Sequence, residues 1–206
     1  MTPPPAPSVR AALDEARRLL AAGPHDAGLA PPAAPAGWLF DNADLLWPGM
    51  RVLDVAAGSG RHARLFAAAG WPATAIDRDA DRMASLAADA ERMHWPLTTI
   101  VRDLETGDAD LGDAAWDLIV VTHYLHRPLM PAIVRALAPG GVLLYETFTT
   151  AQAARGKPTN PAFLLLPGEL PRLVAPLATV RQREEEVDGR MVASVAARKL
   201  SAREPA

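Results

Sequence analysis

The stretch RVLDVAAGSGRHARLFAAAG, residues 51–70, joins an apolar run, a glycine-rich segment and an alanine-rich segment. This order predicts a strand, a tight turn and a helix. Glycines in such a turn let the backbone come close to a ligand, and the first turn of the following helix presents free N–H groups. The stretch therefore predicts an α/β fold with a ligand bound at its first turn.

Apolar runs alternate with helical patterns after this turn, which predicts a parallel sheet with helices on both faces. Near the end of the chain, Asp188-Gly189 separates two further strand-like runs, a strong signal for a short-loop hairpin. We therefore expect five parallel strands followed by an antiparallel hairpin. The expected strands are 51–56, 73–77, 97–102, 117–122 and 142–147, and the expected helices are 61–69, 79–93 and 128–138.

The chain divides into three parts. Residues 1–37 hold a helix that Ser8 caps and Gly23 ends, followed by a loop rich in proline and alanine. Residues 38–200 form the main domain, and residues 201–206 form a tail. The apolar cluster in WLFDNADLLWPGM, which begins at Trp38, either covers the ligand pocket or seals an edge of the sheet.

Composition narrows the classes of function. The 206 residues carry a net charge of −3 and no basic block, which argues against a nucleic-acid partner and favours a small-molecule ligand. The chain has no cysteine, and its histidines show no ligand pairing with a nearby acid, so we expect neither a thiol nucleophile nor a metal site. No apolar run is long enough to span a membrane. We expect a cytoplasmic protein that is a monomer or a homodimer.

Three acidic residues mark the ends of the first three strands. Asp54 lies within the first strand, Asp77 ends the second, and Asp103 follows the third. The carboxyl ends of parallel strands form the ligand-binding edge of an open α/β sheet. Asp54 suits a cofactor with positive charge, Asp77 can accept hydrogen bonds from ribose hydroxyls, and Asp103 can accept one from an adenine amino group.

The glycine turn also fits a second chemistry. Gly58-Ser59-Gly60-Arg61-His62-Ala63 matches the G-x-G-x-x-G/A fingerprint of dinucleotide-binding folds, with Asp77 further along. A nicotinamide-dependent oxidoreductase is therefore the first alternative. It predicts a parallel sixth strand, and it gives Asp54 no role, since a carboxylate at this turn would repel a pyrophosphate.

Four segments together resemble the class I S-adenosylmethionine-dependent methyltransferases over roughly residues 38–200. VLDVAAGSG is similar to their first motif, AIDRD to the ribose-binding segment, VRDLE to the adenine-binding segment and LAPGGVLLYE to the turn into the fifth strand. The resemblance implies a Rossmann-like seven-stranded sheet of order 3-2-1-4-5-7-6, with strand 7 antiparallel. In this sequence Ala56 replaces the family's usual first glycine.

The resemblance also implies S-adenosyl-L-methionine as the cofactor and a methyl transfer to a small-molecule acceptor by in-line displacement. The stretches HYLHRPLMPAIVRALAPGGVLLYETFT and GKPTNPAFLLLPGEL are similar to small bacterial methyltransferases of the tellurite-resistance and thiopurine type. The cofactor-binding residues that follow from it are Asp54, Ala56, Gly58, Gly60, Asp77, Arg78, Asp103, Leu104 and Thr122.

The segment directly after the fourth strand supplies the candidate catalytic residues. In this class the segment faces the transferable methyl group, so His123 and Tyr124 are expected to contact the acceptor, with His123 as a candidate general base. His123 alternatively contacts only the cofactor. A protein that binds the cofactor without catalysing transfer is the second alternative function.

Overall fold

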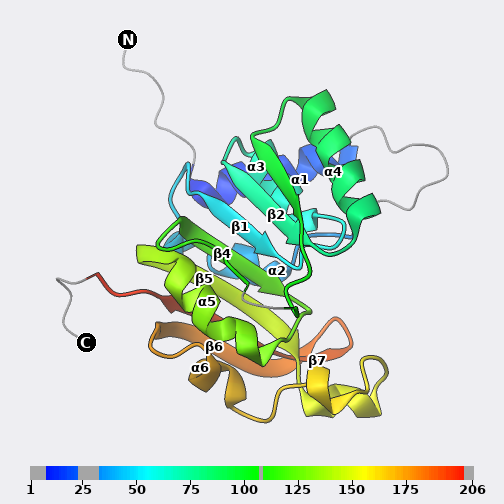
Figure 1. Ribbon diagram of the computed structural model, residues 1–206, viewed down its shortest axis with the longest axis vertical. Coiled ribbons are helices and arrows are strands. Elements are labelled where there is room, and N and C mark those ends of the chain that lie inside the picture. Colours follow the sequence, from blue (N-terminus) through cyan, green and yellow to red (C-terminus); the bar gives the residue numbers. More distant parts are fainter. Residues whose placement is uncertain (1–7, 23–32, 107–108, 202–206) are drawn as a thin grey trace.

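The computed structural model describes residues 8–22, 33–106 and 109–201. Its seven-stranded sheet has the order β3-β2-β1-β4-β5-β7-β6, in agreement with the sequence (Figure 1). β1 to β5 pair in parallel, and β7 pairs antiparallel with both β5 and β6. The strands are β1 Val52–Val55, β2 Ala73–Asp77, β3 Leu97–Val101, β4 Trp116–Thr122, β5 Leu137–Phe148, β6 Ala178–Val187 and β7 Arg190–Arg198.

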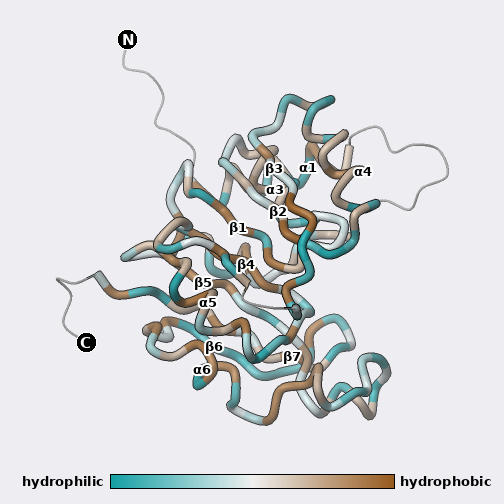
Figure 2. The backbone as a smooth tube through the Cα atoms, in the orientation of Figure 1, coloured by the Kyte–Doolittle hydropathy of each residue, from teal (hydrophilic) through white to brown (hydrophobic). Residues whose placement is uncertain are grey.

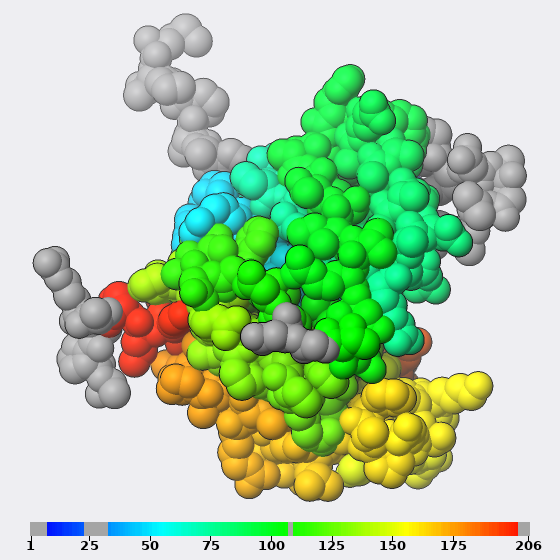
Figure 3. Space-filling view, viewed as in Figure 1, coloured from blue at the N-terminus to red at the C-terminus, as the bar shows by residue number. Residues whose placement is uncertain are grey.

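Helices cover both faces of the sheet. Residues of α1 to α4 share one apolar core with one face, and residues of α5 and α6 share a second core with the other. Figures 1 and 3 show the side on which α5 and α6 lie, and Figure 2 shows apolar residues along the central strands. The helices are α1 Val9–Ala22, α2 Gly37–Asp41, α3 Arg61–Ala68, α4 Ala80–Met93, α5 Met130–Ala136 and α6 Glu169–Leu173.

One expected helix is shorter than the sequence suggested. The expected helix at 128–138 is a short 3-10 turn, Arg127–Leu129, followed by α5, and the chain is extended from Leu137 onward. Ala138 precedes Pro139, and the residue before a proline is biased away from helical backbone. The helix therefore ends early, and β5 begins before the Gly140-Gly141 pair.

The hairpin signal is confirmed. Asp188 and Gly189 both have positive φ, 48° and 75°, which is the backbone that a two-residue type I′ turn requires. The turn brings Arg190, the first residue of β7, back towards the end of β5. This return places the hairpin beside the ligand-binding edge described below.

The N-terminal helix packs on the domain. Its first turn is capped as expected, since Ser8 Oγ accepts from the Ala11 N–H at 3.2 Å. Leu13 and Ala16 are buried in the same core as β1 and α3. The predicted helix end at Gly23, most of the loop at 24–36 and nearly all of the tail lie outside the described residues.

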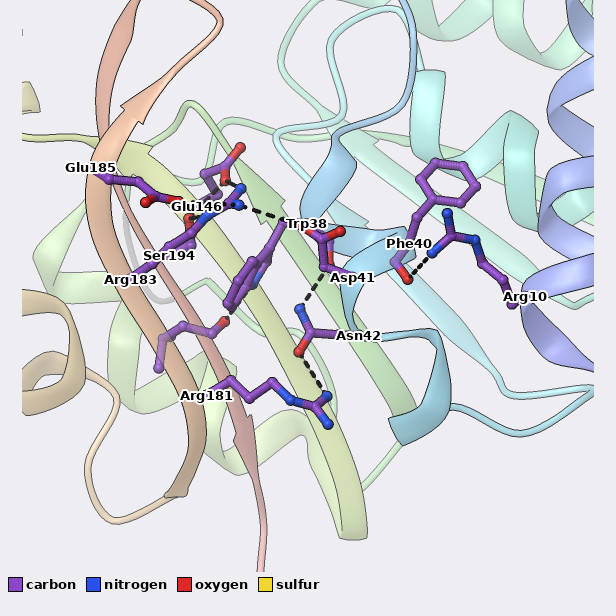
Figure 4. Close-up of polar contacts among 11 residues, drawn as sticks. Arg10, Trp38, Phe40, Asp41, Asn42, Glu146, Arg181, Arg183, Glu185 and Ser194 are labelled. Carbon is purple, nitrogen blue, oxygen red and sulfur yellow. Dashed lines mark hydrogen bonds and ion pairs between the residues drawn. The ribbon is translucent and has the colours of Figure 1, made fainter.

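The Trp38 cluster seals the sheet. Trp38 donates through Nε1 to the Val195 carbonyl in β7 at 3.1 Å, and the Arg183 guanidinium lies 4.6 Å from its ring centroid (Figure 4). Arg181 pairs with Asp44 on the segment after α2. Of the two roles left open by the sequence, the structure shows the packing role.

Candidate active site

A cavity of about 680 Å³ opens at the carboxyl ends of β1 to β4. This is the edge at which open α/β sheets bind ligands. Charged side chains of both signs surround it. The residues that line it are Ala33, Ala56, Ala57, Gly58, Ser59, Arg61, Asp77, Arg78, Asp79, Arg82, Arg102, Asp103, Leu104, Glu105, Thr122, His123, Tyr124, Phe163 and Arg190.

Asp77 organises the floor of this cavity. Its Oδ2 accepts from the Gly58 N–H at 2.7 Å, and its Oδ1 accepts from the Asp79 N–H at 2.9 Å. One carboxylate thereby ties the glycine turn to the end of β2. Each carboxylate oxygen keeps further acceptor capacity for a ligand hydroxyl.

The other predicted residues of the adenosine side also line the cavity. Asp103 accepts from the Glu105 N–H at 2.9 Å, which holds the loop after β3 in a tight turn. Arg78 and Leu104 contribute to the wall, and Leu104 is buried. The charged side chains of Arg78 and Asp103 and the apolar side chain of Leu104 therefore line the cavity together, as predicted.

Asp54 differs from the expectation. It is 1% exposed and is not among the residues that line the cavity. Its Oδ2 accepts from the Ala63 N–H of α3 at 3.0 Å, and its Oδ1 lies 3.6 Å from His62 Nδ1. Since His62 Nε2 accepts from the Ala36 N–H, the ring proton is assigned to Nδ1, which faces Asp54. Asp54 thus caps the helix after the turn from within the protein.

This capping role predicts a large stability effect. Replacing Asp54 with alanine leaves the buried Ala63 N–H without its acceptor and removes the carboxylate that faces His62, so we expect the free energy of unfolding to fall by about 2 kcal/mol. Urea denaturation measures the change. Asp54→Asn keeps one acceptor oxygen and should lose less. A loss below about 1 kcal/mol in the alanine variant would contradict this role.

The two glycines of the turn have different neighbours. Gly58 has φ +57°, and an added Cβ would approach only Arg82 Nη1, at 3.6 Å, so this glycine keeps the cavity open. Gly60 has φ +73°, and an added Cβ would lie 2.4 Å from Leu86 Cδ2 of α4. Gly60 does not line the cavity and is instead required by helix packing. Ala56 lines the cavity and has φ 53°, so it holds a left-handed backbone that the family's usual glycine adopts without strain.

His123 and Tyr124 lie in the cavity, and β5 fixes both through the backbone. The His123 N–H donates to the Glu146 carbonyl at 2.9 Å, and the buried Tyr145 hydroxyl donates to the Tyr124 carbonyl at 2.9 Å. The His123 ring stacks on Phe148 with centroids 4.6 Å apart.

The two side chains face different parts of the cavity. Burial raises the pKa of Tyr124, and the charges of Glu105 and Asp103 act in the same direction. That hydroxyl is buried and has no hydrogen-bond partner among the described residues. The contact between Tyr124 and the acceptor stays a prediction; the acidic charges that act on the hydroxyl come from Asp77 and from the loop after β3.

His123 lies on the opposite side, near two arginines. Burial lowers its pKa to about 4, and the positive charges of Arg61 and Arg190 act in the same direction. The ring is therefore neutral at pH 7. A group with this pKa is a weak base, although its neutral nitrogens can still hydrogen-bond.

The lowered pKa predicts a pH dependence of stability. Between about pH 4 and 6.5 the unfolded chain binds more protons at His123 than the folded chain, so the free energy of unfolding should fall as the pH drops through this window. The contribution is of order 2–3 kcal/mol. Denaturation of the wild type and of His123→Gln at several pH values measures it. Identical slopes in the two proteins would contradict the assignment.

Arg61, Phe163 and Arg190 also line the cavity. Arg61 donates to the Ala34 carbonyl at 3.1 Å and to Thr122 Oγ1 at 3.3 Å, so it joins the segment before α2 to the end of β4. Arg61 directly follows Gly60 in the sequence, and this position beside the glycine turn could have indicated that it lies near the ligand. Phe163 enters the cavity from a loop that Arg127 holds through the carbonyls of Ala162 and Leu164. Arg190 reaches the site only because the hairpin folds back.

Within residues 8–22, 33–106 and 109–201, no group of three or more His, Asp or Glu side chains is placed to hold a metal ion. None of the helices in that part of the chain has the length and apolar character needed to cross a bilayer.

Comparison with known proteins supports the methyltransferase resemblance. Residues 52–141, which run from β1 into β5, match the family model described as "Methyltransferase domain". Residues 52–141 are therefore similar to a methyltransferase domain, as the resemblance to the class I S-adenosylmethionine-dependent methyltransferases implied. The cofactor of this class is S-adenosyl-L-methionine. No curated protein matches the chain in sequence.

Solved structures share the fold of this methyltransferase domain. TehB from Haemophilus influenzae superposes with a TM-score of 0.66 at 19% identity, over 80% of this chain and 62% of TehB, so the chain spans less than two thirds of that protein. An S-adenosylmethionine-dependent methyltransferase from Mesorhizobium loti superposes with a TM-score of 0.63 at 17% identity, over 79% of this chain and 98% of that protein. A third, from Methanosarcina mazei, superposes with a TM-score of 0.60 at 18% identity, over 76% of this chain and 95% of that protein. The antiparallel β7 is the feature that the oxidoreductase alternative did not predict.

Proposed function

We propose that this protein transfers a methyl group from S-adenosyl-L-methionine to a small-molecule acceptor, with the cofactor in the cavity at the ends of β1 to β4. The observation that carries the proposal is Asp77. Its carboxylate holds the glycine turn and faces the cavity with acceptor capacity to spare. A cofactor with ribose hydroxyls and no phosphate suits this arrangement.

The residues present fit the adenosine part of the cofactor. Asp77 is placed to accept from the ribose hydroxyls, and Asp103 from the adenine amino group. Leu104 offers an apolar surface for the ring. The unpaired Tyr124 hydroxyl supplies a further polar atom at this end, which a bound adenosine would satisfy.

The same geometry disfavours a pyrophosphate. The N–H groups of Ala57, Gly58 and Gly60 already donate within the protein, to the Ile76 carbonyl, Asp77 and the Ala57 carbonyl. The Ala63 N–H at the start of α3 donates to Asp54. A pyrophosphate binds through free N–H groups at this position. With these four N–H groups already bonded, the turn offers fewer donors to a pyrophosphate, which favours the sulfonium cofactor.

The methyl end would lie between the glycine turn and the segment after β4. When bound, the cofactor supplies an electrophilic methyl carbon; the acceptor's lone pair forms the new bond while the C–S bond breaks and leaves its electron pair on sulfur. Gly58, Thr122 and His123 line this end and would orient the reactants and exclude water. Because His123 is a weak base, the site suits an acceptor that needs no strong base, such as a thiolate.

Turnover on a panel of three thiols and selenite tests the proposal. We expect S-adenosylhomocysteine to form when the purified chain and S-adenosylmethionine are mixed with 2-mercaptoethanol, thiophenol, 3-mercaptopropionate or selenite, with at least one acceptor consumed. Mass spectrometry of the methylated product confirms the transfer. A chain that binds the cofactor and methylates none of these acceptors would instead favour the non-catalytic alternative.

A further inference from the structure

The cavity has a strongly basic corner at its acceptor end. Arg61 enters from the start of α3, and Arg190 enters from the first position of β7. His123 lies between these elements and carries no charge at pH 7. Burial lowers the pKa of Arg61; the charges of Asp54 and Glu146 raise it, and the charge of Arg190 lowers it. The two guanidinium groups thus repel each other across this corner.

The fold delivers Arg190 to this place. Phe148, on which His123 stacks, pairs with Val192 in β7, and Arg190 lies two residues earlier on the same face of the strand. Glu146 and Ser194 pair on that face as well. The hairpin therefore aims Arg190 at the end of the cavity that holds Thr122 and His123, away from the adenosine side.

No carboxylate neutralises Arg190 within the residues that the structure describes. The nearby Glu146 is committed elsewhere, since its Oε2 accepts from Arg183 at 2.9 Å and from Ser194 at 2.7 Å (Figure 4). Arg61 is partly satisfied by Thr122 and Ala34. In contrast, Arg190 makes no ion pair with any acid in the described segments, and its donors remain available in the cavity.

We infer that the methyl acceptor carries an anionic oxygen-bearing group, and that Arg190 binds this group next to Arg61. The inference rests on the proposed function and narrows its substrate class to small anions. A guanidinium forms paired hydrogen bonds with a carboxylate or another oxyanion, which fixes orientation as well as affinity. The anion would also relieve the repulsion between the two arginines. Phe163, which also lines the cavity, offers an apolar surface for the rest of the acceptor.

The binding of candidate acceptors to the protein saturated with S-adenosylhomocysteine tests the role of Arg190 without requiring turnover. Calorimetry would compare 3-mercaptopropionate with the neutral 3-mercapto-1-propanol, which has a similar length, and would include 4-mercaptobenzoate and selenite. We expect an anion to bind roughly tenfold or more tightly than the neutral analogue, as expected for a charged hydrogen bond. The carboxylates and selenite distinguish an organic from an inorganic anion.

Variants assign the effect to Arg190. Arg190→Gln should remove the preference for the anion, and Arg190→Lys should retain part of it. Arg155 is the matched control, because it is an exposed arginine that pairs with Glu186 of the same hairpin and does not line the cavity. Arg155→Gln should bind as the wild type does.

The titration of His123 gives an independent reading. A bound anion offsets the charges of Arg61 and Arg190, so the pKa of His123 measured by NMR should rise when 3-mercaptopropionate is added. The inference is overturned if none of the anions binds to the loaded protein, if acid and alcohol bind equally, or if Arg190→Gln binds the anion as the wild type does. Failure of S-adenosylhomocysteine itself to bind would be a separate result and would overturn the proposed function.

Discussion

Replacing Asp77 with alanine is expected to lower the affinity for S-adenosylmethionine by roughly 10- to 100-fold, as one or two charged hydrogen bonds are lost. The same carboxylate accepts from the Gly58 and Asp79 N–H groups, so the free energy of unfolding should fall by about 2–3 kcal/mol. Calorimetry and urea denaturation measure the two effects.

A matched control separates affinity from stability. Asp117 also accepts from a backbone N–H, that of Arg51 at 2.9 Å, and from the Arg51 guanidinium, but it lies at the start of β4, at the other end of the strands. Asp117→Ala should lower stability and leave cofactor affinity unchanged. If Asp77→Ala binds the cofactor as the wild type does, the cofactor lies elsewhere.

Replacing Gly58 with valine should reduce cofactor affinity by more than about 100-fold, because the isopropyl group projects into the open cavity over the turn. The φ of +57° adds strain of about 1–2 kcal/mol for a side chain with a Cβ. Binding is measured at a temperature where denaturation shows that the variant is folded.

Gly60 supplies the contrast, since its backbone is also left-handed. Gly60→Ala drives a Cβ into the buried Leu86 side chain and should cost about 2–4 kcal/mol of stability, with cofactor affinity within about threefold of the wild type once folded. The reverse pattern, with Gly60→Ala losing affinity and Gly58→Val keeping it, would contradict the assigned roles.

Much of the fold could be predicted from local signals. The alternation of apolar runs and helices indicated the parallel strands, and Asp188-Gly189 indicated the hairpin, because both depend on short-range backbone chemistry. The resemblance supplied the strand order. The end of α5 was misplaced because helical composition continues to Ala138, whereas the backbone before Pro139 turns extended.

The site was predicted less evenly. Asp77 and Asp103 were found because strand ends converge on one edge of the sheet. Asp54 was expected to face the cofactor, yet its carboxylate turns to the helix and His62. The position of Arg190 in the cavity could not be predicted from the sequence, since it depends on how the hairpin returns along β5. Tertiary packing of this kind is not readable from spacing.

The most direct test is calorimetric titration of the purified chain with S-adenosylmethionine, S-adenosylhomocysteine and NADH, side by side. Asp77 and Asp103 on the cavity wall, together with the turn N–H groups that already donate within the protein, predict micromolar binding of the first two and no binding of NADH. Binding of NADH alone would contradict the account and would place a pyrophosphate at the turn between Ala56 and Arg61.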